Sequence, residues 1–123
     1  MPGIDTFVTP IGGGGLISGM STVAKAADHP IDVIGVEAEL FPSMFNRLNG
    51  TQMTCAGDTL AEGIAVKEPG GLTARMVEAQ VDDIVLVSER SLEESVSLLL
   101  QIEKTVVEGA GAAGLAALLA YPD

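Results

Sequence analysis

The chain has 123 residues, which is enough for one domain with a modest core and too few for two. Its 47% apolar residues exclude a disordered chain, while 3% aromatic residues and 15 glycines predict a core of Val, Ile, Leu and Ala. Seventeen acidic against six basic residues give a formal charge of −11. Because phosphate backbones are bound through clustered Lys and Arg, this balance disfavours nucleic-acid and anionic-membrane partners.

Cysteine usage and the uncharged stretches indicate a soluble protein of a reducing cytoplasm. Cys55 is the one cysteine, so no internal disulfide is possible. We expect it to be a small buried side chain rather than a nucleophile, because the one histidine, His29, lies in an Asp-His-Pro turn. Residues 6–24 are uncharged but contain five glycines and Pro10, and the uncharged stretch 109–122 is shorter than the ~20 residues of a membrane span. The first residues carry no basic cluster, so no signal peptide is predicted.

The first third of the chain predicts a strand, a helix and a second strand. Residues 4–8 predict a buried strand that continues to Ile11, and four glycines follow it. Apolar residues then recur at helical spacing from Leu16 to Ala27. Residues 31–37 are rich in β-branched side chains, which is typical of a parallel strand buried on both faces. The three elements together make a βαβ unit.

The middle of the chain is less regular. Residues 42–48 predict a short helix with proline at its first position, and Asn49-Gly50 predicts the turn that ends it. Residues 51–72 are rich in glycine and predict irregular structure. A further short helix is expected over residues 72–79.

The last third predicts a third strand and two helices. Residues 83–87 form the strand, and Ser91-x-x-Glu94 matches a capping box at the start of a helix. The apolar stripe of that helix comprises Leu92, Val96, Leu99, Ile102 and Val106. Gly109-Ala110-Gly111 is expected to interrupt it, and residues 112–120, apolar all round, predict a helix buried between others. We therefore predict one α/β unit over residues 1–123, with three layers and a mostly parallel sheet of at least three strands flanked by helices.

The glycine run of residues 12–15 is the strongest functional signal, because it lies where the first strand turns into the first helix. At such a turn, backbone N–H groups converge on an anion and the positive end of the helix dipole assists them. A plain flexible turn is the other interpretation. Four glycines cost much backbone entropy, so we favour an anion-binding loop.

The loop matches neither of the common nucleotide-binding motifs. Gly14 and Gly19 have the spacing of a P-loop, but Met20 stands where the phosphate-binding lysine belongs. A dinucleotide fingerprint lacks its third glycine, although Glu37 could serve as its acid at the end of the second strand. A nucleotide-binding βαβ unit stays open as an alternative. A loop of amides without lysine better suits one phosphomonoester on a compact cofactor.

Five segments occur in an order that points to one family: residues 10–19 (PIGGGGLISG), 33–37 (VIGVE), 61–67 (AEGIAVK), 81–85 (VDDIV) and 107–113 (VEGAGAA). Together they resemble the threonine dehydratase (serine/threonine ammonia-lyase) family, which comprises pyridoxal-phosphate enzymes of the tryptophan-synthase-β fold, also called fold type II. The resemblance covers essentially the whole chain. Residues 63–66 favour the dehydratases over the related serine racemases.

The resemblance implies pyridoxal 5′-phosphate as the cofactor, and it implies its binding residues. The cradle for the cofactor phosphate would comprise Gly12, Gly13, Gly14, Gly15 and Leu16. Gly63 matches a glycine whose backbone approaches the substituents of the pyridine ring, and Glu108 matches an acid near that ring, expected at the end of the long helix. A turn glycine and a helix-terminal charge are the alternative interpretations of these two residues.

Some relatives also bind a divalent cation, through an acid matching Glu37, a carbonyl near Phe41 and an acid at position 43. This chain has Ser43 there, so we predict no metal site. Glu37 and Glu39 are then expected to be solvated acids at the end of a strand.

The family reaction is β-elimination of water from threonine, followed by hydrolysis to 2-oxobutanoate and ammonia. It requires a lysine in a Ser-x-Lys-x-Arg type motif, and none of Lys25, Lys67 and Lys104 has that setting. The Ser-Gly-Gly-Asn type turn that meets the pyridine nitrogen is also missing. We therefore assign no catalytic residue and leave open whether this chain is an enzyme, with the hypothesis that it holds the phosphate half of the site without the reactive half.

The expected partners are a small amino-acid substrate and either copies of this chain or the remainder of a longer enzyme. A different class of function, a non-catalytic α/β module that self-associates, remains the principal alternative. It is favoured by the sheet edge and the apolar helix faces that a part of the family's catalytic domain would uncover.

Overall fold

The computed structural model describes residues 3–122, and its centre is a parallel sheet of three strands in the order β1-β2-β3. The strands are β1 (Thr6–Pro10), β2 (Asp32–Ala38) and β3 (Asp83–Val87). Val8 pairs with Ile34 across the first ladder, and Ile34 pairs with Asp83 across the second. The predicted α/β class with a parallel sheet is confirmed, and the first two strands begin two residues and one residue later than predicted.

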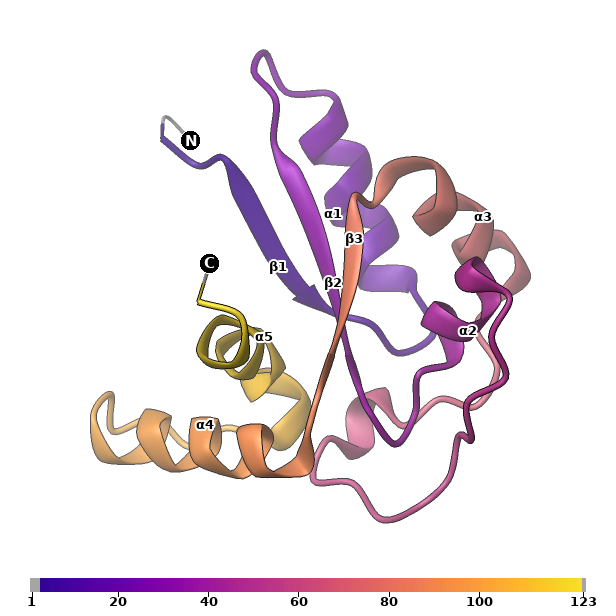
Figure 1. Cartoon of the computed structure of the whole chain (residues 1–123). Helices are drawn as coiled ribbons and strands as arrows, with labels where there is room; N and C mark the ends of the chain where they lie inside the picture. The colour runs from indigo at the N-terminus through magenta and orange to yellow at the C-terminus, as the bar shows by residue number, and fades with distance from the viewer. Residues whose placement is uncertain (1–2, 123) are drawn as a thin grey trace.

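Helices cover both faces of the sheet, which gives three layers (Figure 1). One face is covered by α1 (Gly15–Lys25), α2 (Ser43–Asn49) and α3 (Gly71–Gln80), and the other by α4 (Glu89–Gln101) and α5 (Gly109–Ala120). A single 3₁₀ turn, η1 (Glu62–Ile64), lies within the otherwise irregular stretch between α2 and α3. The predicted irregular structure of residues 51–72 is confirmed apart from that turn and from Gly71 and Leu72, which begin α3.

Alternation along β2 divides the core into two clusters. Val33 faces α1 and α3, whereas Val36 and Ala38 face α5. Because successive side chains of a strand point to opposite faces, this central strand contributes to both clusters at once. The small side chains of α5 pack against the second face, and they account for the abundance of alanine: Ala110, Ala112, Ala113, Ala116 and Ala117.

The predicted start of α4 is wrong by three residues. Ser88 caps this helix, since its Oγ accepts a hydrogen bond from the backbone N–H of Ser91 at 3.2 Å. Ser91 has the residue type and spacing of a capping box, but it lies inside the first turn. The helix also ends earlier than the apolar stripe indicates, so Ile102 and Val106 lie beyond it with 67% and 86% of their surface exposed.

The prediction that Gly109-Ala110-Gly111 interrupts a helix is wrong. This segment forms the first turn of α5. A Cβ on Gly109 would overlap the backbone of Leu60 and Ala61, so the glycine allows two segments to touch. The predicted complete burial of the helix is also wrong in part, because Leu118 and Leu119 are exposed. Over residues 3–122, no helix has both the length and the apolar character that crossing a membrane requires.

The close approach at Gly109 predicts a large cost for a single methyl group. Gly109→Ala should lower the free energy of unfolding by about 1–3 kcal/mol, because the backbone of Leu60 must move. Gly111→Ala is the matched control in the same turn, since its added Cβ would lie 3.9 Å from Val107 Cβ. That variant should be stabilised by about 0.5–1 kcal/mol. Urea unfolding of both variants measures the difference, and equal effects would contradict this account of the contact.

Candidate functional site

The glycine loop begins where β1 leaves the sheet. The backbone N–H of Ile11 still donates to the carbonyl of Val36 at 2.8 Å, so the turn starts at Gly12. Gly14 precedes α1 with a φ of 91°, in the left-handed region that side chains disfavour. A Cβ there would also lie 2.9 Å from both Met44 Cε and Thr73 Cβ. Both the turn and its packing therefore require glycine at position 14.

The other three glycines of the loop differ in the space around them. A Cβ on Gly12 would lie 3.3 Å from the carbonyl oxygen of Gly63, so this residue packs against η1. A Cβ on Gly13 or Gly15 would meet no heavy atom of the described residues within 4 Å. Open space therefore borders Gly13 and Gly15, and packing does not require glycine at either position.

The first turn of α1 leaves backbone donors available. Among residues 3–122, no side chain caps this helix, and its first turn holds no acidic residue. The first N–H groups of a helix have no partner within it, and the helix dipole places partial positive charge beside them. This end of α1 can therefore accept an anion from the open side of the loop.

The structure brings the three predicted segments of the cofactor site together. Gly12 lies against η1, and a Cβ on Gly63 of η1 would lie 3.1 Å from Glu108 Oε1. The prediction that Glu108 lies at the end of the long helix α4 is wrong. Glu108 immediately precedes α5, and its side chain is exposed. The glycine loop follows the carboxyl end of β1, which is the side of a parallel sheet where α/β proteins bind ligands.

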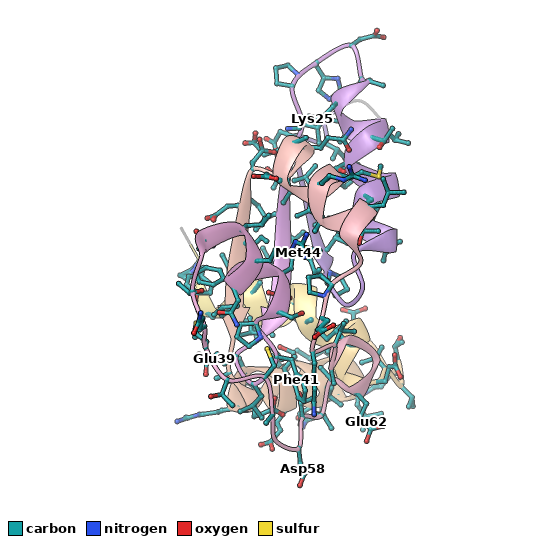
Figure 2. All side chains as sticks on the ribbon, turned by 90° about the vertical axis from the view of Figure 1, so that its right-hand side faces the viewer. Lys25, Glu39, Phe41, Met44, Asp58 and Glu62 are labelled. Carbon is teal, nitrogen blue, oxygen red and sulfur yellow. The ribbon has the colours of Figure 1, made fainter. Side chains whose placement is uncertain are left out.

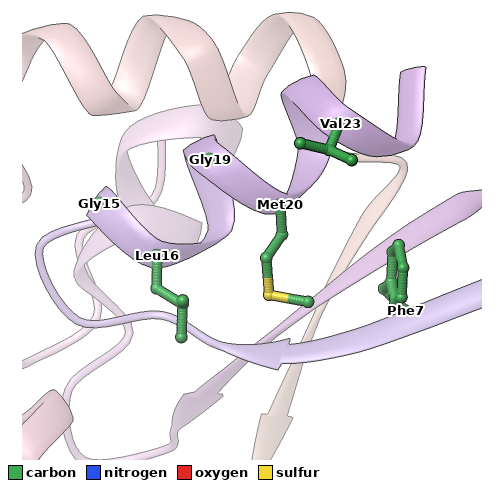
Figure 3. Close-up of a pocket in the computed structure, with 6 residues that line it drawn as sticks. All are labelled: Phe7, Gly15, Leu16, Gly19, Met20 and Val23. Carbon is green, nitrogen blue, oxygen red and sulfur yellow. The ribbon is translucent and has the colours of Figure 1, made fainter. Parts of the chain in front are cut away.

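Leu16 contributes no polar side chain to this cluster. Its side chain is 62% exposed and lines an open groove of about 420 Å³ with Phe7, Met20 and Val23 (Figure 3). The groove lies between the outer side of α1 and β1, and its lining is apolar. A phosphate could use only the backbone N–H of Leu16.

Two of the three lysines are engaged outside the cluster. Lys25 ends α1 and forms an ion pair with Asp82 at 2.7 Å, and its hydrogen bond holds the pKa of Asp82 below the ordinary value. Figure 2 shows Lys25 near one end of the molecule and Glu62 of η1 near the other. Lys104 donates to the carbonyl of Gln101 just beyond α4, and Lys67 is exposed.

The prediction that Glu37 is solvated is wrong. Its side chain is only 1% exposed, and its two carboxylate oxygens accept the backbone N–H groups of Met44 and Phe45, both at 2.9 Å. Burial raises the pKa of this carboxyl, and the two N–H groups offset part of that rise. The sequence does not reveal this role because the partners lie seven and eight residues further on. Glu39 is exposed, as predicted.

The surroundings of Glu37 bear on the predicted lack of a metal site, which stays a prediction. Its carboxylate already accepts two backbone donors, and the buried hydroxyl of Ser43 has no hydrogen-bond partner among the described residues. Over residues 3–122, no three His, Cys, Asp or Glu side chains form a group that could hold a metal ion.

Cys55 is half-buried rather than buried, because the irregular stretch around it lies at the surface. Partial burial, and then the negative charge of Glu37, raise the pKa of its thiol. A thiol that holds its proton is a poor nucleophile, which agrees with the absence of this residue from the predicted site.

Comparison with known proteins identifies the family. The model of the family described as pyridoxal-phosphate dependent enzymes matches residues 2–123. The chain is 46% identical to an L-threonine ammonia-lyase of Thermotoga maritima over 121 residues. These residues cover 97% of this chain and 30% of that protein. It is 44% identical to a catabolic L-threonine dehydratase of Escherichia coli over 118 residues, and these residues cover 94% of this chain and 36% of that protein. The chain thus spans about a third of these curated relatives.

Solved structures agree with the sequence relatives. A threonine deaminase of T.th. superposes with a TM-score of 0.87 at 35% identity, over 95% of this chain and 44% of that one. Maize serine racemase superposes with a TM-score of 0.88 at 33% identity, over 99% of this chain and 37% of that one. The chain belongs to the family of pyridoxal-phosphate dependent enzymes, and the predicted resemblance to threonine dehydratases is confirmed.

The burial of Glu37 predicts a specific pH dependence of stability. Because its pKa in the folded chain lies above the ordinary 4.5, the folded state binds its proton more tightly than the unfolded state does. The stability that this group contributes is therefore complete below pH 4.5 and is lost as the pH rises through the folded pKa. The free energy of unfolding of the natural chain, minus that of Glu37→Gln, should fall as the pH rises above 4.5.

Urea unfolding over a pH series measures this difference. Glu39→Gln, which removes an exposed acid two residues away, is measured beside it as the matched control for the loss of one carboxyl. A difference for Glu37→Gln that is constant across the series would show that the carboxyl is not perturbed by burial.

Proposed function

We propose that this chain binds the phosphate end of pyridoxal phosphate, as part of a threonine dehydratase-type ammonia-lyase. The observation that carries the proposal is the open side of the glycine loop. Gly13 and Gly15 border open space beside the uncapped first turn of α1. This arrangement offers N–H donors to a phosphate and needs no lysine.

The residues present fit the cofactor in chemistry and in space. The bound cofactor would supply an electron sink for bond cleavage at the α-carbon of an amino acid. The amides of residues 12–16 would hold the phosphate, and the missing side chain at Gly63 leaves its backbone beside the carboxylate of Glu108. Because the chain carries a formal charge of −11, no general field attracts a phosphate, so local amides must bind it.

We further propose that these residues alone do not perform the elimination. Lys25 lies near the other end of the molecule from η1 and is paired with Asp82, and neither Lys67 nor Lys104 stands in the family's lysine motif. In this proposal the substrate is a small hydroxylated amino acid, and the reactive lysine is supplied by the remainder of a longer enzyme.

Association with that remainder, or with copies of this chain, is supported by the apolar side chains that the described structure leaves at its surface. The most exposed among them on helices are Leu16, Val23, Leu72 and Leu118. Leu16 and Val23 line one apolar groove with Phe7 and Met20, and contiguous apolar surface of this kind marks interaction sites.

The loop proposal predicts binding that depends on the phosphate group. Pyridoxamine 5′-phosphate is the suitable probe, because its amine cannot condense with the exposed lysines. It should bind more tightly than pyridoxamine, and Gly13→Ala should weaken it by roughly tenfold, about one hydrogen bond to a charged group. NMR titration of the backbone amides measures both affinities.

Gly19→Ala is the matched control, since Gly19 also borders open space but lies inside α1. It should leave the affinity unchanged. Equal affinities of the natural chain for pyridoxamine 5′-phosphate and pyridoxamine would contradict the proposal, as would protection of the fold by ATP or NAD and not by pyridoxal phosphate.

The incomplete site predicts no turnover. With added pyridoxal phosphate and threonine, this chain should release no ammonia or 2-oxobutanoate above the rate that pyridoxal phosphate alone produces. A coupled assay for the 2-oxo acid measures this, with the chain omitted as the control. Clear turnover would contradict the proposal that these residues alone do not perform the elimination.

A further inference from the structure

We propose that Thr73 is the positioning residue of the phosphate loop, and that its hydroxyl sets the direction in which the Gly14 amide points. This inference rests on the proposed function above. It assigns a role to a residue of α3, which lies far from the glycine loop in sequence and outside the segments that resemble the family motifs.

Thr73 reaches the loop from the first turn of α3. Its Oγ1 donates to the carbonyl oxygen of Gly13 at 2.6 Å and lies 3.1 Å from the carbonyl oxygen of Gly70. A hydroxyl has one proton to donate, so the shorter contact, to Gly13, receives the stronger bond. The bond joins residues 60 positions apart.

Thr73 also packs against the backbone of the next glycine of the loop. A Cβ on Gly14 would lie 2.9 Å from Thr73 Cβ and 3.0 Å from Thr73 Oγ1. The backbone of Gly14 therefore packs directly on this threonine, and the loop is held between α3 and α1.

The planarity of the peptide unit links this bond to the anion. In a trans peptide the carbonyl oxygen and the following N–H point in opposite directions. Since the Gly13 carbonyl points to Thr73, the N–H of Gly14 points away from α3. The next peptide is held in the same manner. The Gly14 carbonyl accepts hydrogen bonds from the backbone N–H of Ser18 at 3.1 Å and from its hydroxyl at 2.6 Å. The N–H of Gly15 therefore points out of the N-terminal end of α1.

A peptide between two glycines needs such a restraint. Without side chains, the Gly13-Gly14 unit can rotate between two orientations at little steric cost. In the rotated orientation a carbonyl oxygen would replace the Gly14 N–H on the open side, and it would repel a phosphate. The hydroxyl of Thr73 selects the orientation that presents a donor.

The test compares variants of Thr73, which joins α3 to the loop, with a threonine that joins α3 to α1. Thr73→Val removes the hydroxyl and keeps the shape, and Thr73→Ser keeps the hydroxyl. Thr22→Val is the control, because Thr22 Oγ1 bonds to the Ser18 carbonyl and to Gln80 of α3 without touching residues 12–15. Each variant of this chain is titrated with inorganic phosphate, pyridoxamine 5′-phosphate and pyridoxamine.

Thr73→Val should weaken both phosphate-bearing probes by roughly tenfold and leave pyridoxamine unchanged, while Thr73→Ser should stay within about twofold of the natural chain. The phosphate-induced shift of the Gly14 amide resonance should be lost in the valine variant. A merely structural role for Thr73 would lower the melting temperature without separating the two kinds of probe. Thr73→Ala, which removes the hydroxyl without placing a methyl group against the Gly13 carbonyl, repeats the test if valine prevents folding.

Two results would overturn the inference while the proposed function stands: phosphate affinity of Thr73→Val and Thr73→Ala within about twofold of the natural chain, or an equal loss in Thr22→Val. A natural chain that binds pyridoxamine 5′-phosphate no better than pyridoxamine, and no inorganic phosphate, would overturn the proposed function and this inference with it.

Discussion

Backbone-to-backbone contact at the carboxyl end of the sheet is the constraint on which this fold depends. Gly12 lies against Gly63, and Gly109 lies so close to Leu60 that no Cβ fits between them. Each contact joins segments that are distant in sequence. A side chain at any of these positions would separate η1 from the loop or from α5. The candidate site therefore exists because glycine allows three segments to meet at one place.

Glu37 links two elements of the neighbouring part of the same edge through hydrogen bonds. A buried carboxylate is costly unless its oxygens are hydrogen-bonded, and here both oxygens accept N–H groups at the start of α2. The bond ties the end of β2 to the helix that places Met44 against Gly14. In this chain Glu37 is thus a buried structural acid, and it holds the helix that packs against the glycine loop. It is not a solvated charge at the end of a strand.

The distribution of charge and of apolar surface supports the proposal that these residues act together with further chain. The glycine loop and the carboxylate of Glu108 both approach η1, whereas Lys25 is paired with Asp82 and Lys104 donates to Gln101. Exposed leucines and valines remain on α1, α3 and α5. The chain spans about a third of its curated relatives, and the apolar side chains at its surface are of the kind that further chain would cover.

The sequence by itself determined the elements with strong local signals. The β-branched runs predict the three parallel strands, and the glycine run predicts the turn into α1, because these patterns depend on neighbours along the chain. The resemblance to the threonine dehydratases rests on the same local segments. Boundaries were less predictable: Ser91 has the spacing of a cap, yet Ser88 forms it, since several serines compete for one helix start.

Only the tertiary structure decided the contacts between distant segments. Glu37 is buried because α2 folds back over the end of β2, and Glu108 approaches Gly63 because α5 begins beside η1. Thr73 meets Gly13 because α3 packs against α1, and no local pattern marks that threonine. Periodicity and turn chemistry act over a few residues, whereas the direction of a loop amide or the burial of an acid depends on what lies across the fold.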